Sequence, residues 1–163
     1  ATRVGAVGCS GGGTLTAYLA AVDSRVSAAA IACYFSTLER EINEGTCNYD
    51  AEQILWGQMS FGLDKSDLLA ARAPRPTIVL LTSHDCFPFT GGREGFDEAS
   101  AMFHAHGAEG QSGLYASESP GYHGVTAIGL EAVHTMFREQ LGPLPAAKEP
   151  RDLSPLPCDK LWL

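Results

Sequence analysis

The stretch Gly8-Cys9-Ser10-Gly11-Gly12 decides the fold that we expect for this chain. A short apolar run, residues 4–7, precedes it, and a segment with helical character, residues 14–21, follows it. A serine between glycines, placed where a strand turns sharply into a helix, is typical of a nucleophile elbow. We expect a steric need for glycine, because a Cβ at Gly8 or Gly12 would collide with the neighbouring chain.

The same glycine-rich stretch also fits two simpler structures. It could be an ordinary connection between two elements, or a loop that binds phosphate at a helix N-terminus. A P-loop is excluded, because no Lys-Ser or Lys-Thr pair follows the glycines. A dinucleotide-binding fingerprint fits poorly, since no clear βαβ unit with a ribose-binding acid follows at the expected distance. The rest of the chain therefore has to decide between an elbow and these simpler structures.

Length and composition indicate one globular domain. The 163 residues are 45% hydrophobic and 18% charged, and their formal net charge is −8. This length suffices to bury a sizeable core, and the acidic balance argues against nucleic acid or an anionic membrane as a partner. No apolar run approaches the roughly 20 residues that span a bilayer. We expect a catalytic portion over residues 1–142 and an extended, proline-rich tail over residues 143–163.

Strands and helices alternate along the chain, which predicts a mostly parallel α/β sheet. A capping box at residues 36–39 and a cap at Asp50 are expected to start two of the helices. The apolar runs predict strands over residues 3–8, 26–32, 77–82 and 114–116. Periodicity and capping signals predict helices over residues 14–22, 36–45, 64–72, 90–107 and 128–141, with a further turn beginning at residue 50.

Three residues of complementary chemistry follow the ends of predicted strands. Ser10 follows the first, Asp85 follows strand 77–82, and His123 lies in a glycine-flanked turn after the last. Because such loops meet at one edge of a parallel sheet, we expect the three side chains to meet there. Ser10 would attack a carbonyl carbon, His123 would accept its proton, and Asp85 would orient the imidazole. The Gly11 N–H would be one oxyanion-hole donor, and the order Ser, Asp, His is that of an α/β-hydrolase.

Several residues of the same types need no catalytic role. His84 adjoins the acid, so a contact with the site and a scaffold role are equally open for it. The remaining histidines lie within helices or at their ends, and the remaining carboxylates of interest suit helix caps or surface charge. These residues are His104, His106, His134, Asp50, Asp64, Asp67 and Glu118.

The five cysteines follow no metal-ligand spacing, so no metal site is expected. Cys33 and Cys47 flank a helical segment, and they either form a disulfide or remain two thiols, one buried and one in a loop. Cys9 is expected to be a small buried hydrophobe beside the nucleophile. Cys9, Trp56 and Phe87 are the candidates for substrate contact, although aromatic residues at such spacing belong more often to a core.

Further motifs accompany the elbow. They are Gly13-Thr14, Ala17-Tyr18-Leu19-Ala20-Ala21, Asp23-Ser24-Arg25-Val26, Asp50-Ala51-Glu52-Gln53, Gly62-Leu63-Asp64, Asp67-Leu68-Leu69, Ala73-Pro74-Arg75-Pro76, Asp85-Cys86-Phe87-Pro88, Gly92-Arg93-Glu94 and Gly121-Tyr122-His123-Gly124. Together they resemble the bacterial acetyl xylan esterase-like branch of the α/β-hydrolases over residues 3–141.

This resemblance implies the C-terminal portion of an α/β-hydrolase fold, with the early strands absent from this chain. It implies hydrolysis of carboxylesters through an acyl-enzyme, with no cofactor, in a secreted or periplasmic protein. The second oxyanion donor would come from a loop that precedes the nucleophile strand in the family. An aromatic residue usually follows the acid in this family, whereas here Cys86 does.

Three functions remain open from the sequence. The first is a serine esterase acting on a small acyl ester, with removal of acetyl groups from carbohydrate as one form. The second is a prolyl-oligopeptidase-like peptidase, which shares the elbow and the order of the triad. The third is a hydrolase-derived binding or structural module without turnover. We also expect either a homo-oligomer or a complementing N-terminal segment beside the first strand.

Overall fold

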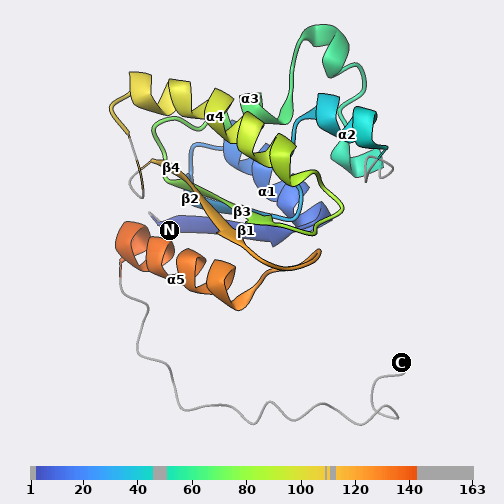
Figure 1. Ribbon diagram of the computed structural model, residues 1–163. Helices are drawn as coiled ribbons and strands as arrows, with labels where there is room; N and C mark the ends of the chain where they lie inside the picture. Colours follow the sequence, from blue (N-terminus) through green and yellow to red (C-terminus); the bar gives the residue numbers. More distant parts are fainter. Residues whose placement is uncertain (1–2, 46–50, 109, 111–112, 143–163) are drawn as a thin grey trace, which may run out of the picture.

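The computed structural model describes residues 3–45, 51–108, 110 and 113–142. The predicted tail over residues 143–163 and the predicted cap Asp50 lie outside these residues. Four strands form a parallel sheet in the order β1-β2-β3-β4 (Figure 1). Their bounds are β1 Val4–Cys9, β2 Val26–Ala32, β3 Thr77–Thr82 and β4 Leu114–Ser119.

The predicted strands are confirmed, and β4 is longer than expected. It runs three residues beyond Ala116 because the polar segment Ser117 to Ser119 continues the pairing with β3. A polar segment gives no apolar signal in the sequence, although it suits a strand at the edge of a sheet. The parallel pairing of all four strands places their carboxyl ends at one edge, where a candidate site is expected.

Helices and short turns connect the strands. Helix α1 (Gly11–Val22) links β1 to β2, and α4 (Phe89–Ala105) links β3 to β4. The connection from β2 to β3 contains α2 (Leu38–Glu44), the 3₁₀ turns η1 (Ala51–Gln53) and η2 (Met59–Phe61), and α3 (Lys65–Ala70). Helix α5 (Ala127–Leu141) is the last helix of the part that the structure describes.

The start of α2 differs from the predicted capping box. Thr37 is the N-cap, and its hydroxyl accepts a hydrogen bond from the Arg40 N–H. The hydroxyl of Ser36 instead donates to the carbonyl oxygen of Pro88, on the chain leading into α4. The prediction of a box beginning at Ser36 was therefore wrong by one residue. A tertiary hydrogen bond replaced the local one, and local spacing could not reveal it.

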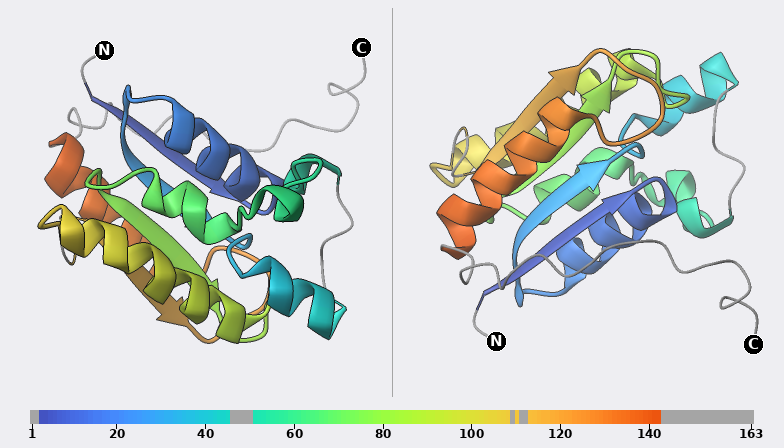
Figure 2. Two further views of the ribbon diagram at one scale, coloured as in Figure 1. Left: turned by 90° about the horizontal axis from the view of Figure 1, so that it is seen from above. Right: turned by 90° about the horizontal axis from the view of Figure 1, so that it is seen from below.

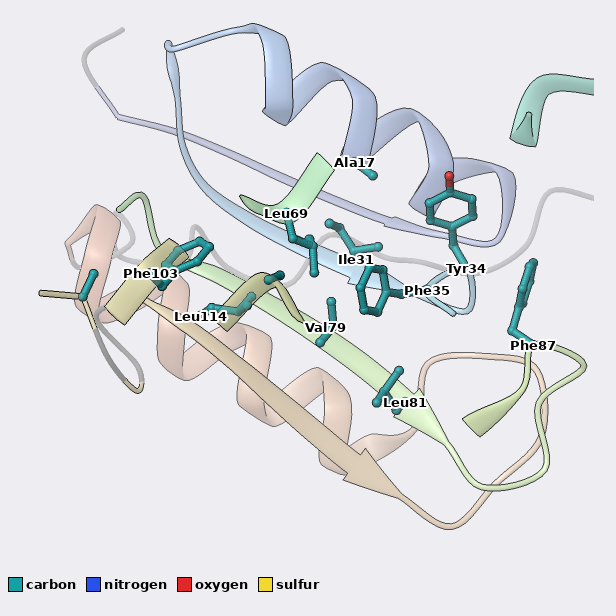
Figure 3. Packing of buried hydrophobic residues seen from close by; sticks show 12 residues of the cluster. Ala17, Ile31, Tyr34, Phe35, Leu69, Val79, Leu81, Phe87, Phe103 and Leu114 are labelled. Atoms are coloured by element: carbon teal, nitrogen blue, oxygen red, sulfur yellow. The ribbon is translucent and has the colours of Figure 1, made fainter. Parts of the chain in front are cut away.

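The sheet is covered by helices on both faces. Helices α1, α3 and α4 lie over one face and α5 crosses the other (Figures 1 and 2). The four alanines of β2, at positions 28, 29, 30 and 32, are fully buried. Their small side chains let helices approach the central strand closely from both sides. The face under α1, α3 and α4 holds the larger cluster, to which Ile31, Val79 and Phe103 belong (Figure 3).

A buried ion pair lies at the carboxyl end of this larger cluster. The Lys65 ammonium is 2.5 Å from a carboxylate oxygen of Glu41, and neither side chain has any exposed area. The ammonium also donates to the Tyr34 carbonyl oxygen and lies 4.2 Å from the centre of the Tyr34 ring. Burial lowers the pKa of Lys65 and raises that of Glu41, while their mutual attraction opposes both changes.

The substitution Lys65→Met is expected to reduce the free energy of unfolding by about 3–5 kcal/mol, because it leaves the Glu41 carboxyl buried without its partner. The double substitution Lys65→Met/Glu41→Leu removes both groups and should recover most of that loss. Urea denaturation followed by circular dichroism measures both. A double variant as unstable as Lys65→Met would contradict this account.

Strand β1 has a partner strand on one side, β2, within the part of the chain that the structure describes. Apolar side chains near this edge are exposed, namely Val7 by 55%, Leu15 by 64%, Leu19 by 49% and Val22 by 84%. Exposed apolar side chains of this kind are compatible with further polypeptide packed beside β1. The homo-oligomer or complementing segment stays a prediction. None of the described helices is both long enough and apolar enough to cross a membrane.

Candidate active site

Ser10 sits in a strained turn between β1 and α1. Its backbone angles are φ 58° and ψ −124°, and few residues other than glycine adopt a positive φ. The Ser10 N–H donates to the Ala32 carbonyl oxygen at 3.0 Å, which ties the turn to the end of β2. The Ser10 carbonyl in turn accepts the Thr14 N–H at 3.0 Å, so the helix begins at once. This is the local geometry of a nucleophile elbow.

This turn needs glycine at two positions, Gly8 and Gly13, and the sequence predicted only the first of them. A Cβ on Gly8 would lie 2.0 Å from the Gly12 carbonyl oxygen, and one on Gly13 would lie 2.5 Å from that of Ala32. A Cβ on Gly12 would meet no atom within 4 Å. The expectation for Gly8 is confirmed and that for Gly12 was wrong. At Gly12 it is the backbone oxygen that needs the space, so the steric demand falls on Gly8.

Gly8→Ala should therefore destabilise the chain, whereas Gly12→Ala should not. Gly8→Ala is expected to lower the free energy of unfolding by about 3 kcal/mol, because backbone atoms have to move. Gly12→Ala should leave it unchanged or raise it by up to about 1 kcal/mol, since alanine favours a helix over glycine. Urea denaturation of the two variants checks this. Equal destabilisation by both would contradict the geometry of the turn.

Asp85 and His123 meet at the carboxyl ends of β3 and β4. An oxygen of the Asp85 carboxylate lies 2.8 Å from His123 Nδ1. The same carboxylate accepts hydrogen bonds from the Thr82 hydroxyl at 3.1 Å and the Phe87 N–H at 3.2 Å. The Asp85 side chain is 5% exposed, whereas that of His123 is 39% exposed. Thr82 and Phe87 thus hold the buried carboxylate in place, and the exposed part of the imidazole remains accessible to a reacting group.

Aromatic packing supports this pair from one side. The Phe87 ring lies 6.1 Å from the His123 ring, with 31° between their planes, and 6.2 Å from the Tyr34 ring. The Lys65 ammonium lies 4.9 Å from the centre of Phe87. Phe87 is only 4% exposed, at the end of the large cluster (Figure 3). It packs behind the imidazole, and its predicted contact with substrate stays a prediction.

The sheet brings Ser10 to the same edge as Asp85 and His123. The register pairs Cys9 with Ala32, Ala32 with Leu80, and Thr82 with Ser119, so the loops after all four strands emerge together. Among the described residues, the Ser10 hydroxyl makes no hydrogen bond to the imidazole. Catalytic hydrogen bonds of this kind often tighten only when substrate binds. The roles of Ser10, Asp85, His123 and of the Gly11 N–H stay predictions.

The loop after β2 contributes a residue to which the sequence assigned no role at the site. Cys33 is a free thiol, 3% exposed, and its Sγ accepts a hydrogen bond from the Gly124 N–H at 3.1 Å. The disulfide between Cys33 and Cys47 was therefore a wrong alternative, and Cys47 lies outside the described residues. Burial chiefly raises the pKa of the Cys33 thiol, with further contributions from the neighbouring Cys9 side chain and from the charge of Asp85.

Cys33, Asp85 and His123 also form a group with potential metal-ligating atoms. One such atom from each side chain lies within 4.8 Å of the others. Two of the three are already engaged in the hydrogen bond between Asp85 and His123. The sequence predicted no metal, and this stays a prediction. Next to them, Cys86 takes part in a disulfide, and its Sγ lies 3.6 Å from His123 Nδ1.

The remaining candidates lie in varied surroundings. Trp56 is 91% exposed between η1 and η2, and Cys9 is half-buried and packs against the cluster under α5. Their predicted contact with substrate stays a prediction. His84 packs against the Tyr122 ring at 5.5 Å, and its Nδ1 is 2.8 Å from the Ser83 hydroxyl. Asp64 caps α3 together with Asp67, as the sequence suggested.

Several solved structures with a similar fold are esterases. An esterase of family CE15 from a marine bacterial metagenome, described as promiscuous, matches 85% of this chain with 22% identity and a TM-score of 0.63. A glucuronoyl esterase from Solibacter usitatus matches 83% with 18% identity and a TM-score of 0.67. A methylesterase matches 85% with 23% identity and a TM-score of 0.63.

No family model and no curated protein matches the sequence. The chain spans 42% of the length of the first two esterases and 30% of the third. The parallel sheet with flanking helices described above matches the fold of these esterases over the shared part. Over the part that it shares with these esterases, the chain has an α/β-hydrolase fold.

Proposed function

We propose that this chain carries the catalytic residues of a serine carboxylester hydrolase. One observation carries the proposal: the hydrogen bond of 2.8 Å between Asp85 and His123, at the sheet edge where Ser10 occupies a strained elbow. An acid, a base and a nucleophile that come from three separate loops are difficult to explain by packing alone. The esterases with a similar fold support the same class of reaction.

Ser10 Oγ attacks the carbonyl carbon of the ester, and His123 accepts the proton of the hydroxyl. Asp85 keeps the proton of the imidazole on Nδ1 and stabilises the positive charge that forms. The N–H of Gly11 donates to the oxyanion, together with a second donor from elsewhere. His123 then protonates the leaving alcohol, and water, activated by the same imidazole, releases the acid from the acyl-enzyme.

Carbohydrate esters are the substrates that we propose. The resemblance in sequence favours an acetyl group carried by a sugar, whereas two similar folds belong to proteins named glucuronoyl esterases. The two substrates place the sugar on opposite sides of the ester bond. Parallel assays with an acetylated xylose and with methyl glucuronate therefore decide which side the site prefers. An aminoacyl amide serves as a third substrate, and its faster hydrolysis would favour a peptidase.

A fluorophosphonate probe tests the chemistry directly. The purified chain is treated with the probe, and the modified residue is located by mass spectrometry. We expect rapid modification of Ser10 and none in Ser10→Ala, because phosphonylation requires a serine activated by the imidazole. Circular dichroism of both proteins checks that they are folded. A folded chain that the probe leaves unmodified would contradict the proposal and favour a binding module.

A further inference from the structure

Cys33 has an unusual backbone for its place in the fold. It follows directly after β2, and its φ of 52° lies in the region that favours glycine. Neighbouring residues of a strand point to opposite faces of the sheet, yet Cys33 and Ala32 both pack in the cluster under α5. The turn at Cys33 thus brings its thiol to the face on which Cys9 also packs.

The Cys33 thiol lies close to both residues of the proposed acid–base pair and packs in the cluster that also contacts the end of β1. Cys9, the residue before Ser10, packs against the same cluster as Cys33. The thiol also lies near Asp85, whose charge raises its pKa. Its Sγ accepts the Gly124 N–H at 3.1 Å, directly after His123. Sγ also lies within 4.8 Å of both an Asp85 carboxylate oxygen and a ring nitrogen of His123. Cys33 is therefore a free, buried thiol beside both members of the proposed acid–base pair.

The hydrogen bond from Gly124 constrains His123 itself. That N–H belongs to the peptide that joins His123 to Gly124, so holding it fixes the ψ angle of His123. The other end of the turn is held by a hydrogen bond of 2.9 Å from the His84 N–H to the Gly121 carbonyl. Both glycines have a φ near 150°, so the turn needs these fixed points to keep one conformation.

We propose that Cys33 is a positioning residue, whose thiol fixes the His123–Gly124 peptide so that the imidazole meets Asp85. The expected effect of Cys33 on turnover rests on the proposed function, whereas its effect on the conformation of His123 does not. Burial and the nearby carboxylate raise the pKa of the thiol, so that it stays neutral. A neutral thiol accepts the Gly124 N–H without placing a second negative charge beside the Asp85–His123 pair.

The test compares Cys33→Ala with Cys33→Ser in the full chain. Alanine removes the acceptor, whereas the serine oxygen can still accept the Gly124 N–H. We expect Cys33→Ala to lower kcat by about 10–100-fold with little change in KM, and Cys33→Ser to regain most of the loss. In NMR spectra, Cys33→Ala should speed hydrogen exchange at the Gly124 amide and broaden the Nδ1 proton signal of His123.

Val133→Ala is the matched control, because Val133 is a buried residue of the same cluster, on α5. It should lower the melting temperature without changing kcat or the two NMR signals. Unchanged kcat and NMR signals in Cys33→Ala would overturn the inference, and so would an equal loss of kcat in Val133→Ala. If the wild-type chain shows no turnover, the proposed function fails, and the NMR signals alone decide the role of Cys33.

Discussion

Ser10→Ala is expected to lower kcat for ester hydrolysis by at least about 10⁴-fold, while the chain keeps its fold. The substitution removes the attacking oxygen, and neither His123 nor Asp85 can replace it as a nucleophile at the elbow. Alanine has to adopt the φ of 58° as well, so a modest loss of stability is also expected. Steady-state hydrolysis of p-nitrophenyl acetate and thermal melting measure the two effects separately.

Ser83→Ala is a suitable control for this experiment. Ser83 is exposed, follows β3 at the same edge of the sheet, and forms its hydrogen bond with His84 rather than with His123. Its substitution should leave kcat essentially unchanged. Retention of most activity in Ser10→Ala would show that another group attacks the ester, and the proposed mechanism would have to be abandoned.

Asp85→Asn is expected to lower kcat by about 10⁴-fold, the loss typical of a triad whose acid becomes an amide. The carboxylate now accepts three hydrogen bonds, from His123, the Thr82 hydroxyl and the Phe87 N–H. An asparagine offers one oxygen and an NH₂ group. The NH₂ would face one of the donors that now bind the carboxylate. If it faced His123, it would donate to Nδ1 and so force the imidazole proton onto Nε2, the nitrogen that must accept the Ser10 proton.

The comparison variant is Asp97→Asn, because Asp97 is an exposed carboxylate on α4. It changes the net charge by the same amount and should keep full activity. Kinetic assays over a range of pH values distinguish a wrong tautomer from a general loss of folding. If Asp85→Asn and Asp97→Asn have equal activity, Asp85 does not orient the imidazole.

Much of this arrangement could be predicted from the sequence, because it follows from strand order. The apolar runs at 26–32 and 77–82 and the glycines around Ser10 place three loops at one edge of a parallel sheet. Asp85 comes shortly after strand 77–82, which predicts its place at this edge of the sheet, and the structure places its carboxylate 2.8 Å from His123 Nδ1 there. Neither the motif nor the spacing alone would have sufficed, since the two residues lie far apart in the chain.

The parts that could not be predicted depend on tertiary contacts. The pairing of Lys65 with Glu41 joins α3 to α2 in the core, where periodicity favours apolar residues. The predictions for Ser36 and Gly12 used local spacing alone. The Ser36 hydroxyl instead donates to Pro88, which is distant in sequence, and a Cβ on Gly12 would meet no other atom within 4 Å. Cys33 did have a signal. It directly follows the predicted strand 26–32, and the rule that places the other loops at one edge of the sheet would have placed it there as well.

The register of the sheet has a consequence for how this chain can vary. Cys9 lies opposite Ala32, and a slip of one residue would displace the serine by about 3.3 Å and turn it to the other face. By contrast, the crossover over residues 34–76 connects β2 to β3 and, where the structure describes it, contains no strand of the sheet. Its length can change without altering the distances between reacting groups, because pairing sets them. Natural variation in chain length should therefore collect in this crossover and be rare within the strands.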